Sequence, residues 1–596
     1  MRSLSFFLAI VTVTAAAPQP PVIYTGTTAV TTAADGGLPP AVGVHAVQVY
    51  RANRTKPTHV DGLTDTYLHA PMLVWWQGYF YLEYLSGPRD EHQDPCSTSL
   101  VRSRDGITWE APRVIFPAIR LPSGAFTLAH QRMGFYTAPD GRLLVLAFYG
   151  VPPSPNDGTG LGRVVREIYR DGSLGPIHVI RPNARQPFPG FSLPYPLYSD
   201  STDAEFIAAC RSLLANKLMT AQWWEEDQLD ETGFYTVRGK ALSFARRPDG
   251  SVLGVWKNAL VAVTADEGRS WTEKTFATGL PNNASKYWLQ RTGDGRYALF
   301  FNPTNRNRHP LAVATSADTR EFGGLLSVHG ELPDQRFGGG YKNMGPQYVR
   351  GLVEGNGQAP DAAAASWITY SVNKEDIWVA RVPVPISGKV SGPVVDAFDQ
   401  QPAGGLPSGW NVYSPVWAPV RVVAEGPGGN HVLSLSDEDP YDYARAIRVF
   451  PATHGLRASF RVLARQPGTR LEIDLLDEAG ARPVRIALGE DGRIWACHEG
   501  QWLDAGPYAT GRWLRFDLNI PPEADADRCA ITVDGKAVLK RPAFFTDPVR
   551  TVHRISFRTG LARDRGYGGR DLPGADERSP RAEFLIDDVS LAPVGP

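Results

Sequence analysis

The 596-residue chain has few cysteines, few methionines and almost no net charge. It contains 4 Cys and 5 Met, and its 61 Lys and Arg residues are offset by 62 Asp and Glu residues, which gives a formal net charge of -1. A protein that binds nucleic acid through bulk positive charge needs an excess of Lys and Arg, so we expect no nucleic-acid partner. Any preference for a charged ligand must therefore come from a local cluster of side chains.

Long apolar runs are missing beyond the N-terminus. The opening stretch, MRSLSFFLAIVTVTAAAPQP, joins one Arg to a short apolar run and an Ala-rich end, which indicates a cleaved secretory signal over residues 1–17. No later stretch is apolar enough to cross a bilayer, so we expect a secreted monomer with no membrane partner. The sequons at Asn53 and Asn283 would carry glycans if the host is a eukaryote.

The four cysteines are an even number, which in a secreted protein favours disulfides. Three pairings are possible. If the chain divides at the boundary given below, pairing Cys96 with Cys210 and Cys497 with Cys529 places one bridge in each domain.

Strand signals recur along the first two-thirds of the chain, with turn residues between them. In RMGFYTAPDGRLLVLAFYG, ALSFARRPDGSVLGVWKN and YWLQRTGDGRYALFFNP, an Asp-Gly turn joins two apolar or alternating runs, which predicts a hairpin. Four-stranded units repeating every about 45 to 55 residues are typical of a β-propeller. Six inner strands can be identified, so we expect six or seven blades; these strands start near His69, Arg132, Phe191, Lys240, Tyr287 and Gly345.

Two turns resemble the Asp-box of sialidase-type propellers, and a third is a degenerate version. They span Ser103–Trp109, Thr264–Trp271 and Ser316–Phe322. In such a box, the Asp and a small polar residue bind turn amides and the aromatic residue packs between strands, so we expect a structural role. One segment departs from the strand pattern: DAEFIAACRSLLANKLMTAQWWEEDQ has helical spacing behind a Ser/Thr/Asp start, which predicts an inserted amphipathic helix or a long irregular loop.

After Pro385 a Gly/Pro/Ser-containing junction leads into a new run of short strands. The all-β fold is therefore expected to comprise a β-propeller over residues 18–388 and a β-sandwich of jelly-roll type over residues 389–596. If the first and last sandwich strands pair, Asp396 and Asp588 would lie close together and could hold a structural Ca²⁺ ion. Solvated turn aspartates are the alternative interpretation.

In a propeller blade, the loop before the first strand and the loop from the second to the third strand share one face. On that face the sequence places mainly cations, which would gather where the inner strands converge. A ring of His, Arg and Lys predicts a site for a compact anion, and nearby aromatics such as Trp75, Tyr149, Tyr341 and Tyr348 favour a carboxylated sugar. A phosphate is less well matched, because no Gly-rich strand-to-helix cradle is present.

The segments HAPMLVWWQGYFYLEYLSGPRDEH and YSVNKEDIWVARVPVP resemble secreted L-rhamnose-α-1,4-D-glucuronate lyases, which are related to propeller α-L-rhamnosidases. The resemblance covers the propeller and implies seven blades, an acidic plant-type polysaccharide such as arabinogalactan or gum arabic as substrate, and no required cofactor. It implies proton transfer by His69 and His92, with Tyr149 as phenolic partner. The implied substrate-binding residues are Arg89, His130, Arg132, Arg163, Arg211, Arg306 and Lys342.

Two other functions fit the same sequence. The first is hydrolysis of the same terminus, for which Asp90, Glu91, Glu375 and Asp376 are candidate carboxylates. For Lys374, Glu375 and Asp376, a structural ion-pair cluster is favoured over contact with substrate. The second is a non-catalytic glycan-binding propeller with a lectin-like sandwich.

Overall fold

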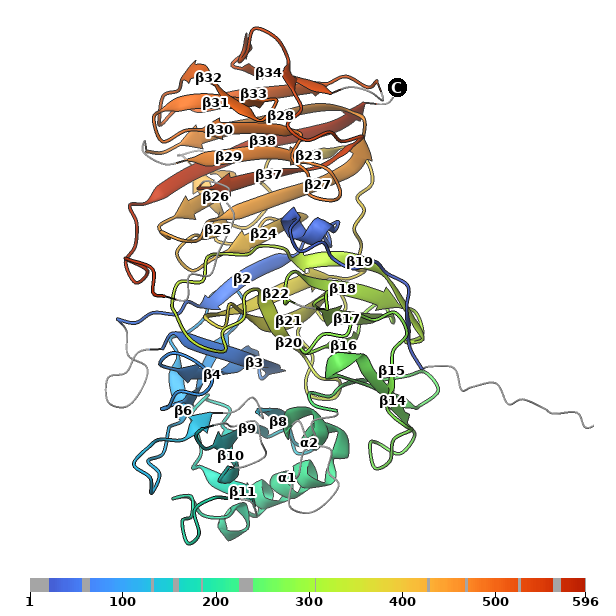
Figure 1. The fold of residues 1–596 in the computed structure, drawn as a ribbon, viewed down its shortest axis with the longest axis vertical. Helices are drawn as coiled ribbons and strands as arrows, with labels where there is room; N and C mark the ends of the chain where they lie inside the picture. The colour runs from blue at the N-terminus through green and yellow to red at the C-terminus, as the bar shows by residue number, and fades with distance from the viewer. Residues whose placement is uncertain are drawn as a thin grey trace, which may run out of the picture.

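The computed structural model describes residues 21–55, 65–129, 133–153, 160–183, 186–224, 239–305, 307–425, 429–466, 470–523, 527–560 and 570–594. The signal peptide expected over residues 1–17 lies outside these ranges. Strands dominate the fold, which comprises a ring of small sheets and a two-layered sandwich next to it (Figure 1). None of the described helices is long and apolar enough to span a bilayer.

The ring begins with three sheets of consecutive antiparallel strands. The first contains β3 (Tyr67–Trp76), β4 (Tyr79–Gly87), β5 (Ser97–Ser103) and β6 (Arg113–Phe116). The second contains β7 (Leu128–Ala129), β8 (Gly134–Thr137), β9 (Leu143–Gly150), β10 (Gly162–Ile168) and β11 (His178–Pro182), and both β7 and β8 pair with β9. The third contains β12 (Ser243–Arg246), β13 (Val252–Trp256), β14 (Leu260–Thr264) and β15 (Thr275–Phe276).

Two more four-stranded units complete the ring. One contains β16 (Trp288–Arg291), β17 (Tyr297–Phe301), β18 (Leu311–Ser316) and β19 (Glu321–His329), with β1 (Ile23–Tyr24) added in parallel to β19. The other contains β20 (Pro346–Gly351), β21 (Ala365–Val372), β22 (Asp376–Pro383) and the N-terminal strand β2 (His45–Tyr50). The strand β2, which pairs antiparallel with β22, therefore closes the ring.

The first strands of these units meet around the centre of the ring. The strand β3 packs against both β8 and β20, while β16 packs against β12 and β20. The propeller prediction is confirmed, but the described residues form four separate blade sheets and a fifth unit that continues into the sandwich, so seven blades are not confirmed. The blade expected to start near Phe191 is absent from the described chain, because residues 186–203 contain only the short 3₁₀ helix η3 (Tyr198–Asp200).

Two helices, α1 (Ala204–Ala215) and α2 (Lys217–Trp224), take the place of that blade. Asp203 caps α1 by accepting hydrogen bonds from the amides of Glu205 and Phe206, and the apolar residues at helical spacing are buried. The inserted amphipathic helix is thus confirmed. Because α2 packs against both β8 and β12, the helices fill the gap between the second and third blades.

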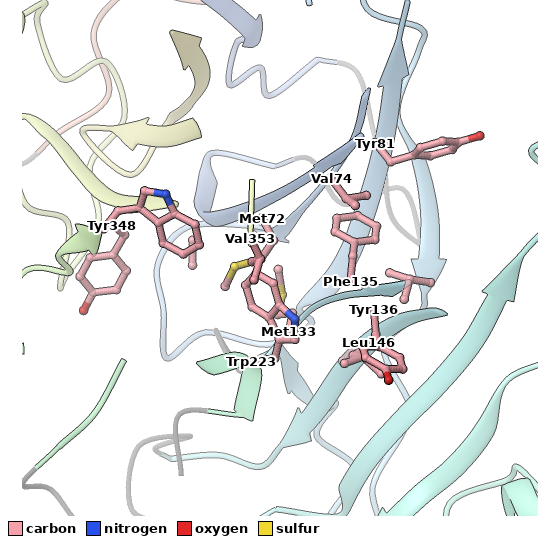
Figure 2. Packing of buried hydrophobic residues seen from close by; sticks show 14 of the residues in the cluster. Met72, Val74, Tyr81, Met133, Phe135, Tyr136, Leu146, Trp223, Tyr348 and Val353 are labelled. Atoms are coloured by element: carbon pink, nitrogen blue, oxygen red, sulfur yellow. The ribbon is translucent and has the colours of Figure 1, made fainter. Parts of the chain in front are cut away.

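Trp223 of α2 is fully buried and belongs to the apolar cluster shared with the ring. Figure 2 shows its indole beside Met133, with Met72 and Val353 close by. The approach is so tight that a Cβ atom added at Gly134, on β8, would overlap the Trp223 ring. Gly134 is therefore required by packing.

The three Asp-box turns are confirmed as structural devices. In the first, one carboxylate oxygen of Asp105 accepts hydrogen bonds from the amides of Ile107 and Thr108, both at 2.8 Å. In the second, Asp266 binds the amide and the hydroxyl of Ser270. Each box joins the third and fourth strands of its blade, namely β5 to β6, β14 to β15, and β18 to β19.

The sandwich has two sheets with a shared apolar core. The first sheet runs in the order β24 (Trp410–Ser414), β27 (Arg445–Thr453), β37 (Val552–Thr559), β29 (Leu471–Leu476), β30 (Val484–Leu488), β31 (Arg493–His498) and β32 (Gln501–Pro507). The second runs in the order β25 (Val420–Glu425), β26 (Asn430–Asp437), β38 (Ala582–Val594), β28 (Gly455–Ala464), β33 (Trp513–Ile520), β34 (Arg528–Val533) and β35 (Lys536–Ala537). The short strands β23 (Val394–Asp396) and β36 (Ala543–Phe544) pair with β38 and β34.

The N-terminal strand β2 joins the two parts of the fold. One of its edges pairs with β22 of the propeller and the other pairs in parallel with β24 of the sandwich. Blade and sandwich layer thus form one 11-stranded sheet, and the chain crosses between them from Pro383 to Val394.

The first and last sandwich strands pair as expected, with Asp396 opposite Val589. The two aspartates considered as calcium ligands are bound to arginines instead: Asp396 accepts from Arg448 Nε at 2.7 Å, and Asp588 lies 2.7 Å from Arg461 Nε. Within the described ranges no group of three or more His, Cys, Asp or Glu side chains could hold a metal ion. Asp396 and Asp588 thus neutralise cations.

The disulfide prediction is wrong, because all four cysteines are buried and none is bonded to another. Cys497 lies in β31 and Cys529 in β34, which belong to opposite sheets of the sandwich. Cys210 lies on the buried face of α1, and Cys96 precedes β5 in the first blade.

The side chain of Asn283, in one of the two sequons, is engaged inside the protein, since its buried amide nitrogen donates to the carbonyls of Thr304 and Asn307, both at 2.7 Å. This leaves Asn283 poorly suited to carry a glycan.

Trp223→Ala should lower the free energy of unfolding by about 3 to 5 kcal/mol, because it leaves a cavity between two blades. Gly134→Ala should also destabilise the protein, since its new methyl group meets the indole. The double variant should lose less free energy of unfolding than the sum of the two single losses, because removing the ring also removes the clash. Denaturant unfolding of the three variants checks this, and strict additivity would contradict the contact.

Four thiols per unfolded chain should react with a thiol reagent in denaturant without prior reduction. The expected count follows from four cysteines that form no bond to one another. A count of two or none would show that bridges form in the native protein.

Candidate functional site

Two neighbouring inner strands, β3 and β20, carry irregularities at the same level. The pairing register of β3 shifts between His69 and Met72, and that of β20 shifts between Gln347 and Arg350. Backbone angles in the left-handed region accompany both shifts, at Ala70 (φ 50°) and Tyr348 (φ 59°). Because β-bulges re-aim side chains, the rings of His69 and Tyr348 meet with their centroids 4.3 Å apart.

Tyr348 lies at the edge of the apolar cluster, with its hydroxyl directed away from it (Figure 2). Lys257 Nζ donates to this hydroxyl at 2.8 Å. Two more cations lie near the ring centroid, Arg308 at 4.9 Å and Lys286 at 5.0 Å. The phenol is therefore surrounded by positive charge.

Loops and edges of three blades supply these cations. Lys257 lies between β13 and β14, Lys286 precedes β16, Arg308 lies between β17 and β18, and Lys374 lies between β21 and β22. All four positions belong to the face that the blade rule separates from the Asp-box turns. The expected gathering of cations on one face is thus present around Tyr348.

Opposing effects act on the ionisation of Tyr348. Burial alone would raise the pKa of its phenol, but Lys257, Arg308 and Lys374 stabilise the phenolate and lower the pKa to about 7. Protonated phenol and phenolate are then both populated near neutral pH. Such a group can act as a nucleophile or as a base.

His69 is fully buried beside this phenol. Its Nδ1 atom lies 2.7 Å from the Ser371 hydroxyl, and its Nε2 atom has no hydrogen-bond partner among the described residues. Burial, reinforced by Lys374 and other nearby cations, holds the pKa of His69 well below its usual value. The imidazole is therefore neutral.

The loop between β4 and β5 closes one side of the cluster. Lys374 Nζ donates to a carboxylate oxygen of Glu91 at 3.0 Å and to the carbonyl of Tyr341 at 2.7 Å. His92 stacks on the Tyr341 ring with centroids 4.1 Å apart, and its Nδ1 atom lies 3.0 Å from the Pro153 carbonyl. His92 thus lies at the rim, while His69 lies at the base.

The other expected site residues bind or pack against other groups, are exposed to solvent, or lie outside the described residues. The Tyr149 hydroxyl donates to the carbonyl of Pro117 at 2.8 Å, and burial raises its pKa well above the usual value. Arg163 is buried on β10 over Phe148, Arg211 lies on the exposed side of α1, and Arg89 is exposed in the β4–β5 loop. His130, Arg132 and Arg306 lie outside the described residues.

Lys342 has a place in the protein interior. Its ammonium donates to the carbonyls of Thr66 and Phe337 and to a carboxylate oxygen of Glu375, at 2.7, 3.1 and 3.1 Å. These three bonds use its three protons, so Lys342 holds the blade together and has none left for a ligand.

Glu375 and Asp376 belong to the same buried cluster. Glu375 also accepts from the amides of Arg336 and Phe337, and the guanidinium of Arg336 lies 2.5 Å from Asp376. The structural ion-pair interpretation of these two carboxylates is confirmed.

Sequence reasoning missed Lys257 altogether and considered Tyr348 only as a stacking aromatic. A signal for Tyr348 was available, because it is the third residue of its inner strand, as His69 is of β3. Lys257 follows a hydrophobic strand directly, and only the register of the β13–β14 turn shows that it points to the centre.

One tyrosine should ionise near pH 7, which an ultraviolet titration of the folded protein can detect as a tyrosinate signal. Tyr348→Phe should remove this step, whereas Tyr149→Phe should leave it in place because burial raises the pKa of that phenol. Lys257→Gln should move the step to higher pH, since the phenolate loses its closest cation. A wild-type titration with no step below the usual tyrosine range would refute the assignment.

Three family models match separate parts of the chain. The model described as "BT_1020-like, N-terminal beta propeller" matches residues 20–240, the "BNR repeat-like domain" matches residues 202–342, and the "Sialidase-like, CBM domain" matches residues 410–567. None of the curated proteins matches the chain.

Among solved structures, one titled "Sialidase" is 38% identical over 96% of this chain, with a TM-score of 0.89. This chain covers 54% of that one, so it spans about half of its length. The Trypanosoma rangeli sialidase in complex with 2,3-difluorosialic acid is 12% identical (TM-score 0.34), covering 93% of this chain and 96% of its own. The xylan β-1,4-xylosidase from Bacillus halodurans C-125 is 11% identical (TM-score 0.32), covering 94% and 100%. The chain therefore resembles sialidase-like β-propellers over its first part and, over residues 410–567, a sialidase-like carbohydrate-binding domain.

Proposed function

We propose that this protein is an exo-acting glycoside hydrolase that releases a terminal sugar bearing a carboxylate. The observation that carries the proposal is the Tyr348 phenol, held among four cations with a pKa of about 7. A glycan-acting role agrees with the carbohydrate-binding domain and with the 38% identical structure titled "Sialidase". Sialic acid is itself a sugar with a carboxylate.

The cations would serve two purposes in such a site. Those at hydrogen-bond distance from a substrate carboxylate would bind it by charge-assisted bonds, for which Lys286 and Arg308 are the nearest candidates beside Lys257. The same charges stabilise the phenolate. Because the charges are fixed in a largely buried cluster, they need no rearrangement when negative charge develops.

The reaction would proceed in two displacements. The Tyr348 phenolate attacks the anomeric carbon, the bond from that carbon to the glycan oxygen breaks, and the leaving oxygen takes a proton from an acid at the rim, where His92 lies. Water then attacks the glycosyl-tyrosine, its proton passes to the base so formed, and the phenolate is restored. Two inversions give retention of configuration.

A phenol suits a substrate that is itself an anion. A carboxylate nucleophile would bring a second fixed negative charge next to the substrate's carboxylate. Tyr348 is neutral for part of the time at pH 7 and is ionised beside Lys257, so its charge is balanced within the protein.

A second candidate is the elimination of L-rhamnose from rhamnosyl-α-1,4-glucuronate ends of a plant-type glycan such as arabinogalactan. The observation in its favour is neutral His69, whose Nε2 atom has no hydrogen-bond partner among the described residues, next to Tyr348. Either group could remove the proton α to the uronate carboxylate. We further propose that the protein is secreted and that the sandwich holds the polysaccharide near the propeller. A purely binding role would not require an ionised phenol.

The decisive experiment is to incubate the purified protein with gum arabic, pectic polysaccharide and a sialylated glycoprotein, and to identify the released sugars by mass spectrometry. Release of an acidic monosaccharide supports hydrolysis. Release of rhamnose with the ultraviolet absorbance of a C4=C5 unsaturated uronate supports elimination. No release from any of them would count against both enzymes and favour the binding role.

Tyr348→Phe should lower kcat on the active glycan by about 10³-fold or more, because it removes the nucleophile. In the wild type, kcat/KM should rise with pH through about 7, since the phenolate form increases as the phenol loses its proton. Lys257→Gln should move this acid limb to higher pH. A Tyr348→Phe variant that keeps its activity would rule out this mechanism.

A further inference from the structure

Tyr341 is an exposed aromatic residue at the rim of the candidate site. It exposes 64% of its surface, although one face of its ring is stacked on His92. Two other aromatic residues, Tyr169 and Phe276, are exposed among the described residues, but Tyr341 is the most exposed of the three, and its carbonyl accepts from Lys374 of the cation cluster. The ring therefore presents a flat apolar surface to solvent close to a cluster of cations.

The ring is held firmly in this position. Residues 338–342, the Gly-rich strap GGGYK, are tied at several points: Gly340 N donates to Asp90 at 3.2 Å, Gly338 N donates to Asp571 at 2.9 Å, and Lys342 is anchored in the interior. Tyr341 itself has φ 60°, in the left-handed region that non-glycine residues rarely adopt. Such a conformation persists only where the surroundings fix it.

Lys374 links this ring to the reacting phenol. Its ammonium donates to the carbonyl of Tyr341 and is one of the cations that lower the pKa of Tyr348. The ammonium of Lys374 thus contacts the backbone of Tyr341 and lies close enough to Tyr348 to stabilise its phenolate. A sugar on the ring would be the neighbour of a sugar whose anomeric carbon lies at Tyr348.

We propose that Tyr341 is the stacking platform for the glycan unit next to the acidic sugar that is released. This inference rests on the proposed function and assigns the leaving-group side of the same site. The C–H face of a pyranose packs well on a flat aromatic ring, and such a ring loses little conformational entropy on binding. Tyr341 would then select glycan substrates over simple glycosides of the same acid.

The test compares two substrates with the same acidic sugar: the polysaccharide or glycoprotein on which the wild type is active, and the methyl glycoside of the released acid. For Tyr341→Ala, the ratio of kcat/KM on the glycan to kcat/KM on the methyl glycoside should fall about five- to tenfold. Tyr341→Asn, which tolerates the left-handed backbone without a ring, should give the same fall. Tyr341→Phe should retain the wild-type ratio.

Tyr169→Ala is the matched control, because Tyr169 is 38% exposed and follows β10, where the third and fourth strands of its blade are joined on the opposite face. It should leave the ratio as in the wild type. An unchanged ratio in both ring-free variants would overturn the platform while leaving the hydrolase intact. Failure of the wild type to release an acid from any glycan would instead overturn the proposed function, and the platform with it.

A second readout does not depend on turnover. In electrophoresis, the Tyr348→Phe protein should migrate more slowly through a gel that contains the same glycan than through a gel without it. Adding Tyr341→Asn should abolish most of this retardation. Equal retardation of the single and double variants would also overturn the platform.

Discussion

The contact between Lys257 and Tyr348 sets the chemistry of the ring's centre. A tyrosine buried among apolar side chains normally holds its proton more tightly, as Tyr67, Tyr84 and Tyr149 do here. At Tyr348 the outcome is reversed, because cations from three blades converge on one hydroxyl. No single blade supplies all four cations, so the site depends on how these neighbouring blades pack together.

The structural turns and the cation-bearing loops lie on opposite faces of the ring. The turns between third and fourth strands use Asp, Ser and Thr side chains to satisfy backbone amides. The other face carries the bulged strands and the four cations. The bulges matter as much as the residue types, because without the register shifts the two rings would point along the blade faces.

Much of the architecture could be predicted from local patterns. The Asp-Gly hairpins, the Asp-boxes, the helix behind Asp203 and the change to a sandwich after Pro385 all have short-range signals, and the structure contains each of them. The number of blades could not be obtained in this way, because a helical insertion and a blade occupy similar space between β8 and β12. The disulfide prediction failed for a related reason, because an even number of cysteines does not show in which sheets those cysteines lie.

The site was harder to predict than the face on which it lies. Strand order alone predicted a gathering of cations on one face, and Arg308, Lys286 and Lys374 lie there in the structure. Their partner Tyr348 was missed as a reacting group because its ionisation depends on charges up to about ninety residues away in sequence, such as Lys257. Lys342 shows the opposite error. It was predicted to bind substrate, but its ammonium donates to two carbonyls and to Glu375 inside the protein.

The strand β2 has a consequence for how the protein forms in the cell. It is synthesised long before its two partners, β22 and β24, which end at Pro383 and Ser414. The ring thus cannot close until more than half of the chain has been made, and closing it also creates the first edge of the sandwich. Until then β2 is an unpaired strand, open to wrong partners. The propeller and sandwich are separate in sequence but share one late step of assembly, so neither is a natural unit for expression alone.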